Sequence, residues 1–180
     1  MRIIAGQARG RKLNTLPGDN TRPTLDRTRE ALFNILQTRV FDAQVLDLFA
    51  GSGALALEAL SRGAESAVLC DKSAEACKVI RQNIDAVRVS EKAQLLNCEA
   101  QAAAKRLAGR KFDLIFLDPP YHLRLVDEAL RDIVQNDLLA ENGLITAETA
   151  ADEGFDVPEG LTIKNVRKYG KSLLHFIERA

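Results

Sequence analysis

Short apolar runs along the chain alternate with longer segments in which apolar residues recur every three or four positions. A compact apolar run bounded by turn residues is typical of a buried strand, and the longer spacing is typical of a helix packed on one face. The pattern predicts strands at residues 45–49, 66–70, 93–97, 113–117 and 143–148. It predicts helices between them at residues 54–62, 74–87, 99–108 and 123–136. Strands that alternate with helices imply a parallel sheet covered on both faces.

The alternation of strand and helix ends before the last part of the chain. Leu161–Tyr169 and Ser172–Ile177 are joined by a short turn at Gly170, which leaves no room for a helix. Such a pair forms an antiparallel hairpin. We therefore expect an α/β fold with a doubly wound, mostly parallel, seven-stranded Rossmann-like sheet that ends in this hairpin.

The N-terminal part of the chain has a looser pattern. Arg2–Ala5 and Lys12–Leu16 predict an irregular β-hairpin. Residues 17–23 contain two prolines, a glycine, an aspartate and an asparagine, which is typical of a linker. Thr24 is then expected to cap a helix, with Asp26 in its first turn, where the helix dipole favours an acid.

Formal charge is spread unevenly along the chain. Its net charge is zero, but residues 1–39 hold eight basic and three acidic residues, which gives +5 there and leaves −5 for residues 40–180. A basic segment on an acidic body suggests that the segment binds a polyanion. We therefore predict a basic hairpin-and-helix extension at 1–39 and a main domain at 40–180. The residues expected to contact the polyanion are Arg9, Arg11, Lys12, Arg22, Arg27 and Arg29.

Length and composition restrict the class of protein. A chain of 180 residues, 46% hydrophobic and 28% charged, suits one globular domain with a small appendage. No apolar run approaches the roughly 18 residues of a membrane span, and no secretory signal is recognisable. The three cysteines lack metal-binding spacing and are expected to be reduced thiols. We expect a cytoplasmic, monomeric protein without a metal.

A glycine-rich turn follows the first predicted strand of the main domain. Residues 47–53 read DLFAGSG, so Gly51 and Gly53 stand between the strand and the next helix. A strand, a glycine turn and a helix together can hold a nucleotide-like ligand. With Ala56, the pattern also fits the dinucleotide fingerprint G-x-G-x-x-A, with Asp71 about 20 residues further on. A nicotinamide-dependent oxidoreductase therefore stays open at this point.

Acidic residues follow three of the predicted parallel strands. Asp71 follows the second strand, Glu99 the third and Asp118 the fourth. In a doubly wound sheet the ligand lies beyond these strand ends. We expect Asp71 to accept hydrogen bonds from ribose hydroxyls and Glu99 to accept one from an adenine amino group.

The tetrapeptide Asp118-Pro119-Pro120-Tyr121 follows the fourth strand. Two consecutive prolines fix the backbone and remove two N–H donors, so acceptors are left to face the cleft. Asp118 and the Pro119 carbonyl can each take one N–H, and Tyr121 can stack on a flat ring. This tetrapeptide suits a planar group that carries an NH₂.

Both motifs resemble those of S-adenosylmethionine-dependent methyltransferases that modify exocyclic amines. Residues 47–53 look like their cofactor motif, and residues 118–121 look like their (Asp/Asn)-Pro-Pro-(Tyr/Phe) catalytic motif. The chain is most similar to the bacterial RsmD type, which methylates N2 of a guanine in 16S ribosomal RNA. That similarity extends over nearly the whole chain, through residues 2–6 (RIIAG), 9–13 (RGRKL), 22–34 (RPTLDRTREALFN) and 57–64 (LEALSRGA).

The resemblance implies roles for particular residues. The catalytic residues are expected to be Asp118, Pro119, Pro120 and Tyr121. The cofactor is expected to contact Asp47, Phe49, Ala50, Gly51, Ser52, Gly53, Asp71, Lys72, Cys98, Glu99 and Asp118. A guanine, unpaired or flipped out of the RNA, is expected to stack on Tyr121 while Asp118 and the Pro119 carbonyl hold its amine.

The leading hypothesis is thus a methyltransferase for 16S ribosomal RNA, acting within an assembling small subunit. A DNA adenine-N6 methyltransferase would use the same catalytic motif, but we see no added segment for reading DNA. An oxidoreductase would leave the tetrapeptide and the basic extension unexplained. A non-catalytic RNA-binding assembly factor would not need Asp118 and Tyr121.

Overall fold

A seven-stranded sheet forms the centre of the protein. The computed structural model describes the backbone of residues 1–17 and 23–180 and the side chains of residues 1–17 and 26–180, so most of the predicted linker and Arg22 lie outside the described residues. The sheet order is β3-β2-β1-β4-β5-β7-β6. The strands are β1 (Gln44–Asp47), β2 (Ser66–Asp71), β3 (Ala93–Asn97), β4 (Phe112–Leu117), β5 (Leu139–Ala150), β6 (Leu161–Tyr169) and β7 (Ser172–Arg179). The predicted α/β sheet is confirmed.

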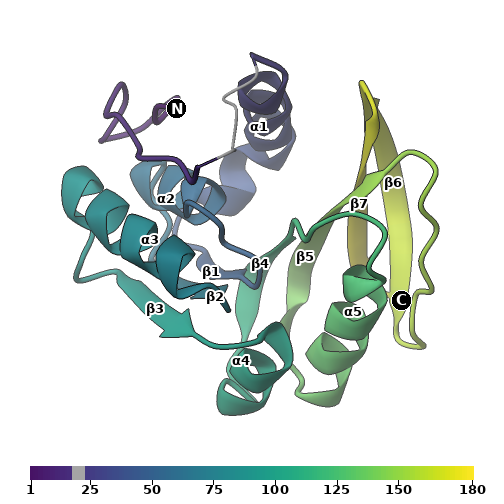
Figure 1. Ribbon diagram of the computed structural model, residues 1–180. Coiled ribbons are helices and arrows are strands. Elements are labelled where there is room, and N and C mark those ends of the chain that lie inside the picture. Colours follow the sequence, from purple (N-terminus) through teal and green to yellow (C-terminus); the bar gives the residue numbers. More distant parts are fainter. Residues whose placement is uncertain (18–22) are drawn as a thin grey trace.

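Helices cover both faces of this sheet (Figure 1). They are α1 (Pro23–Leu36), the short 3-10 helix η1 (Gln37–Val40), α2 (Ala54–Ser61), α3 (Ala74–Val87), α4 (Ala100–Arg106) and α5 (Leu125–Gln135). Successive strand residues point to opposite faces, so Val45 joins the apolar cluster under α1, α2 and α3, and Leu46 joins the cluster under α4 and α5. Burial on both faces explains why the central strands are continuous apolar runs. Within the described part of the chain, no helix has the length and apolar character needed to cross a bilayer.

The C-terminal hairpin closes one end of the sheet. Strands β1 to β5 pair in parallel, whereas β7 pairs antiparallel with both β5 and β6. After β5 the chain therefore forms the edge strand β6 first, and then turns back so that β7 fills the place between β6 and β5. The predicted antiparallel end of the sheet is confirmed.

Several element boundaries differ from the prediction by a few residues, and two of these differences have a clear physical reason. Strand β5 begins at Leu139, four residues earlier than expected, because the exposed Glu141 and Asn142 interrupt its apolar pattern. Helix α1 begins at Pro23, so Thr24 lies inside the helix and the prediction that it is the cap residue is wrong. Proline suits the first helical position because it has no N–H to leave unpaired and its φ is already helical.

The N-terminal arm, residues 1–16, packs against α2 instead of forming a full hairpin. One antiparallel bridge, between Arg2 and Lys12, is found in the described part of this arm. The backbone amides of Ile4 and Ala5 donate instead to the Glu58 carboxylate, at 2.8 and 3.0 Å. Ser61 forms three more hydrogen bonds with arm backbone groups through its hydroxyl and its carbonyl. Because these backbone groups are hydrogen-bonded to α2, they are not available for the strand pairing that a longer hairpin would require.

The arm also shares the hydrophobic core of the main part. Ile3, Ala8 and Leu13 are buried in the cluster that joins the sheet to α1, α2 and α3. A Cβ atom at Gly6 would lie 1.8 Å from the Ser61 carbonyl oxygen, so only glycine permits this approach. The arm is thus packed firmly onto the body, and the division of the chain after residue 39 stays a prediction.

Candidate active site

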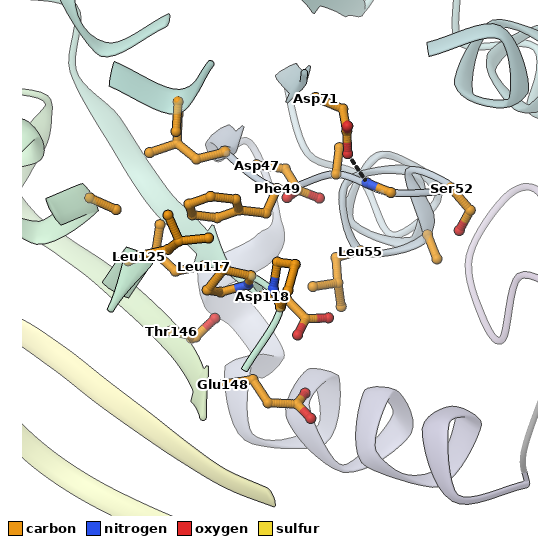
Figure 2. Close-up of a pocket in the computed structure, with 18 of the residues that line it drawn as sticks. Asp47, Phe49, Ser52, Leu55, Asp71, Leu117, Asp118, Leu125, Thr146 and Glu148 are labelled. Atoms are coloured by element: carbon orange, nitrogen blue, oxygen red, sulfur yellow. Dashed lines mark hydrogen bonds between the residues drawn. The ribbon is translucent and has the colours of Figure 1, made fainter. Parts of the chain in front are cut away.

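A cavity of about 740 Å³ opens beside the carboxyl ends of β1, β2 and β4. Strand β1 lies between β2 and β4. The strands that follow β1 in the chain, β2 and β3, lie on one side of it, and β4 and β5 lie on the other, so the strand order reverses at β1. Such a switch point is where doubly wound sheets bind ligands. The walls come from the turns after β1 and β4, the ends of β2 and β5, and helix α1 (Figure 2). Its volume suits a ligand of small-molecule size.

The turn after β1 depends on its glycines. Gly51 and Gly53 have φ of +55° and +81°, in the left-handed region that glycine adopts without strain. A Cβ atom at Gly51 would meet nothing within 4 Å, so open space borders the backbone there. Gly53 instead faces the core, where a Cβ atom would come within 3.1 Å of Leu69. Of the two glycines, Gly51 lines the cavity and Gly53 supports the turn from behind.

Asp71 braces this turn from the end of β2. Its Oδ2 accepts a hydrogen bond from the Gly51 N–H at 2.9 Å (Figure 2). Its Oδ1 accepts one from the Ser73 N–H at 2.9 Å. A carboxylate oxygen has two lone pairs, so each can accept a second hydrogen bond. Asp71 is therefore placed both to hold the turn and to meet hydroxyl groups of a ligand.

Asp47 is a buried carboxyl on the cavity wall, only 1% exposed. Burial raises its pKa to about 7, the nearby Asp71 charge adds to this effect, and the backbone amides of Phe49 and Ala56 oppose it. Its Oδ1 has no hydrogen-bond partner among the described residues. A buried charge of this kind needs a cation or a donor. Together with the open space at Gly51, it fits a cationic ligand such as S-adenosylmethionine.

Most of the other predicted cofactor residues line the same cavity. Phe49, Ala50, Ser52, Lys72 and Glu99 are on the wall. Lys72 and Glu99 form an exposed ion pair, with Nζ 3.8 Å from Oε1. Cys98, however, is absent from the wall, since its thiol turns toward Cys70, with the two sulfur atoms 4.0 Å apart.

The four residues of the Asp118–Tyr121 turn all line the cavity opposite the glycine turn. Just beyond it, His122 and Arg124 have φ of +62° and +54°. Left-handed backbone at ordinary residues carries strain, and it persists where surrounding contacts hold it. Here Arg124 forms ion pairs with Asp127 and Asp156, at 2.8 and 3.0 Å, which anchor the loop to α5.

The Tyr121 hydroxyl is tied to two strands that sequence reasoning did not include in the site. It donates to Oε1 of Glu148 on β5 at 2.8 Å and lies 2.8 Å from Oγ of Ser172 on β7. Tyr121 remains 40% exposed and lines the cavity, so it is accessible to a ligand. Glu148 lines the cavity too. The sequence did contain a signal for Glu148. It stands at the end of the predicted strand 143–148, just as Asp118 stands after the predicted strand 113–117, so the pattern places both acids at the same edge of the sheet.

The predicted polyanion contacts divide into exposed and buried residues. Arg9, Arg11, Lys12 and Arg27 are exposed, and the Arg11 Nη1 also donates to the Ala86 carbonyl at 2.8 Å. Arg29 is only 5% exposed, so it is withdrawn from the outer surface, and its contact with the polyanion stays a prediction.

Arg29 belongs instead to the inner wall of the cavity. Its Nη2 donates to the Arg2 carbonyl at 2.6 Å and to Asp26 at 3.1 Å, while burial lowers its pKa. The helical spacing from Arg29 to Leu32, Phe33 and Leu36 was the available signal, because it puts all four on one face of α1.

Comparison with known proteins agrees with this geometry. A family model described as conserved hypothetical protein 95 matches residues 1–178. Ribosomal RNA small subunit methyltransferase D of Haemophilus influenzae is 37% identical over 172 residues, covering 94% of this chain and 89% of the relative. The protein of the same name from Escherichia coli K12 is 36% identical over 180 residues, covering 99% and 90%. The solved structure of Escherichia coli yhhF has a TM-score of 0.87 at 35% identity, covering 99% of this chain and 97% of that one.

Proposed function

The chain belongs to the family described as conserved hypothetical protein 95, and from this premise we propose that it is a ribosomal RNA methyltransferase. In finer detail, it transfers a methyl group from S-adenosylmethionine to the N2 amine of a guanine in 16S RNA of the small ribosomal subunit. Support comes from relatives named ribosomal RNA small subunit methyltransferase D that match nearly the whole chain at 36–37% identity.

One structural observation carries the proposal. The glycine turn with Asp47 and Asp71 and the acceptor-rich Asp118–Tyr121 turn line the same cavity of about 740 Å³. A methyl donor and an amine bound to these two turns would therefore meet without bulk water between them. Bringing two reactants together in this way supplies much of the advantage of an enzymatic transfer.

The cofactor would be held by the turn after β1 and the ends of β2 and β3. Asp47 faces the cationic part of the ligand, and Asp71 accepts hydrogen bonds from ribose hydroxyls. Glu99 is assigned to the adenine amino group, and its exposed position on the cavity wall supports this assignment. When bound, S-adenosylmethionine supplies an electrophilic methyl group on a sulfonium centre.

The amine is oriented by the Asp118–Tyr121 turn. A guanine amino nitrogen is a weak nucleophile because its lone pair is delocalised into the ring. Asp118 and the Pro119 carbonyl accept hydrogen bonds from its two N–H groups and so direct the lone pair toward the methyl group. Tyr121 stacks on the base once it has left the RNA helix. One proton leaves the nitrogen as the methyl group arrives, and either Asp118 or water accepts it.

Contact with the RNA backbone is assigned to the exposed basic residues of the extension. Arg9, Arg11 and Lys12 lie on the arm, and Arg27 lies on α1. The rest of the chain carries an excess of five negative charges and would repel RNA. In this proposal the enzyme acts as a cytoplasmic monomer on the assembling small subunit.

A labelling experiment tests the proposed activity. The protein is incubated with tritium-labelled S-adenosylmethionine and, separately, with 16S RNA, small subunits lacking the modification, and duplex DNA. We expect label in ribosomal RNA, free or in subunits, and none in DNA. Label in DNA alone, or no transfer to any substrate by folded protein, would contradict the proposal.

A further inference from the structure

We propose that Glu148 selects guanine by accepting a hydrogen bond from its N1–H group, beside the amine held by Asp118. This inference rests on the proposed function, because it names the group that identifies the base in the same cavity. The Asp118–Tyr121 turn suits any planar base with an exocyclic amine, and adenine and cytosine carry one as well. Selection of guanine therefore needs a group that reads the ring nitrogen next to the amine.

The register of the sheet places Glu148 beside Asp118. Strands β4 and β5 are parallel, and Leu117 is paired with Ala147. The next residues are Asp118, directly after the end of β4, and Glu148, on β5. Adjacent strands lie about 4.8 Å apart. Figure 2 shows Asp118, Thr146 and Glu148 on one wall of the cavity, as expected from the alternation of side chains along β5. Two acceptors at this spacing match two neighbouring donors on one edge of a base.

Tyr121 fixes the orientation of the Glu148 carboxylate. The tyrosine has one hydroxyl proton and donates it to Oε1 of Glu148, so Ser172 is the donor in the second 2.8 Å contact. Burial raises the pKa of Tyr121, which keeps this proton in place. Among the described residues no hydrogen bond occupies Oε2 of Glu148. One oxygen is thus committed to the protein and the other is available to a ligand.

The chemistry of the bases explains the selection. On the Watson–Crick edge of guanine the N2 amine stands next to N1–H, so two donors lie side by side. In adenine and cytosine the ring nitrogen next to the amine has a lone pair and no hydrogen. An ionised carboxylate only accepts hydrogen bonds, so it attracts the first arrangement and repels the second. A site built around such a bond strongly rejects a base that lacks the donor.

The test uses small subunits in which the methylated guanosine, once located by labelling, is replaced by the nucleoside of 2,6-diaminopurine. This base keeps the N2 amine, but its N1 is an acceptor. We expect wild-type protein to prefer guanine by roughly a hundredfold or more in kcat/KM. In Glu148→Gln, the amide oxygen keeps the hydrogen bond from Tyr121 and the amide N–H₂ faces the base. Turnover of guanine should then fall roughly tenfold to a hundredfold, and the preference for guanine should shrink at least tenfold.

Glu141→Gln is the matched control, because Glu141 is an exposed glutamate on the same strand. It should keep the wild-type rate and preference, and calorimetry should show equal cofactor affinity in all three proteins. If Glu148→Gln keeps the wild-type preference, or loses activity equally on both bases, the inference is overturned. If wild-type protein transfers no methyl group to guanine in ribosomal RNA, the proposed function fails instead, so the two failures are distinguishable.

Discussion

The two sides of the cavity are built in different ways. The cofactor side, made of Asp47, the glycine turn and Asp71, comes from the ends of two adjacent strands and one short turn. The base side, made of Asp118–Tyr121, Glu148 and Ser172, comes from three strands and is joined through the hydroxyl of Tyr121. The first depends on local sequence and the second on the register of the sheet. Variants on the two sides should therefore separate binding of the cofactor from turnover of the base.

The largest expected effect is on the base side. Asp118→Ala removes an acceptor for the amine and should lower turnover by roughly 10²–10⁴-fold, the range typical of general acid–base groups. Cofactor affinity, measured by calorimetry, should stay close to that of the wild type because the glycine turn is intact. A variant that methylates at the wild-type rate would remove Asp118 from the catalytic assignment.

The next effect concerns the pH dependence of stability on the cofactor side. Asp47 has a pKa of about 7 in the folded protein, against about 4 in an unfolded chain, so the folded state holds the proton more tightly. Its stabilising contribution is full below about pH 4 and is lost as the pH rises through about 7. Asp47→Asn removes this loss and should gain about 3–4 kcal/mol relative to wild type between pH 4 and pH 8.

Urea unfolding of both proteins without cofactor, at pH 4 and pH 8, measures this difference. The comparison between the two pH values cancels any constant effect of the amide. Parallel pH profiles for Asp47→Asn and wild type would show that Asp47 titrates normally in the fold.

Asp71→Ala should weaken S-adenosylmethionine binding more than RNA binding. The loss of charge-assisted hydrogen bonds costs roughly 1.5–3 kcal/mol, or more than tenfold in affinity. The structure adds a second cause, because the Gly51 amide also loses its acceptor. Unchanged cofactor affinity in a folded variant, measured by calorimetry, would remove Asp71 from the cofactor side.

Two substitutions at Tyr121 separate the contribution of ring stacking from that of the hydroxyl hydrogen bonds. Tyr121→Ala should lower kcat/KM through lost stacking worth about 1–3 kcal/mol. Tyr121→Phe keeps the ring and loses only the hydrogen bonds to Glu148 and Ser172, so its loss should be smaller. Equal losses in the two variants would mean that the ring itself adds nothing.

The smallest effect per residue is expected on the arm. A triple Arg9/Arg11/Lys12→Ala variant should bind RNA more weakly, with the salt slope of binding reduced by about one for each lost phosphate contact. Cofactor affinity should be unchanged. Lys164→Ala, an exposed lysine on β6, is the control. An unchanged slope in the triple variant would leave the arm without a role in RNA recognition.

The sequence predicted the fold well, and it also identified the glycine turn and Asp71 that line one side of the cavity, because these signals are local. The glycine turn, the strand before it and Asp71 are readable within about 25 consecutive residues. The role of Gly53 as a support against Leu69 and the turn of Cys98 toward Cys70 were not readable, because they depend on packing across the sheet.

The base side and the arm were less predictable for the same reason. Glu148 and Ser172 reach Tyr121 only once β5 and β7 are in register, and single-strand patterns do not fix register. The predicted hairpin is confirmed only around the Arg2–Lys12 bridge, because Glu58, far along the chain, takes two backbone donors of the arm. Arg29 was counted as a surface charge although its helical spacing with Leu32 and Phe33 puts it on the buried face of α1.

The most direct test of the central claim is the identity of the methylated nucleoside. Small subunits lacking the modification are incubated with S-adenosylmethionine and either the wild-type protein or Asp118→Ala, and their 16S RNA is digested and analysed by mass spectrometry. Our account predicts N2-methylguanosine at one position with the wild type and little or none with the variant. Methylation of adenosine, or N2-methylguanosine formed equally by both proteins, would contradict it.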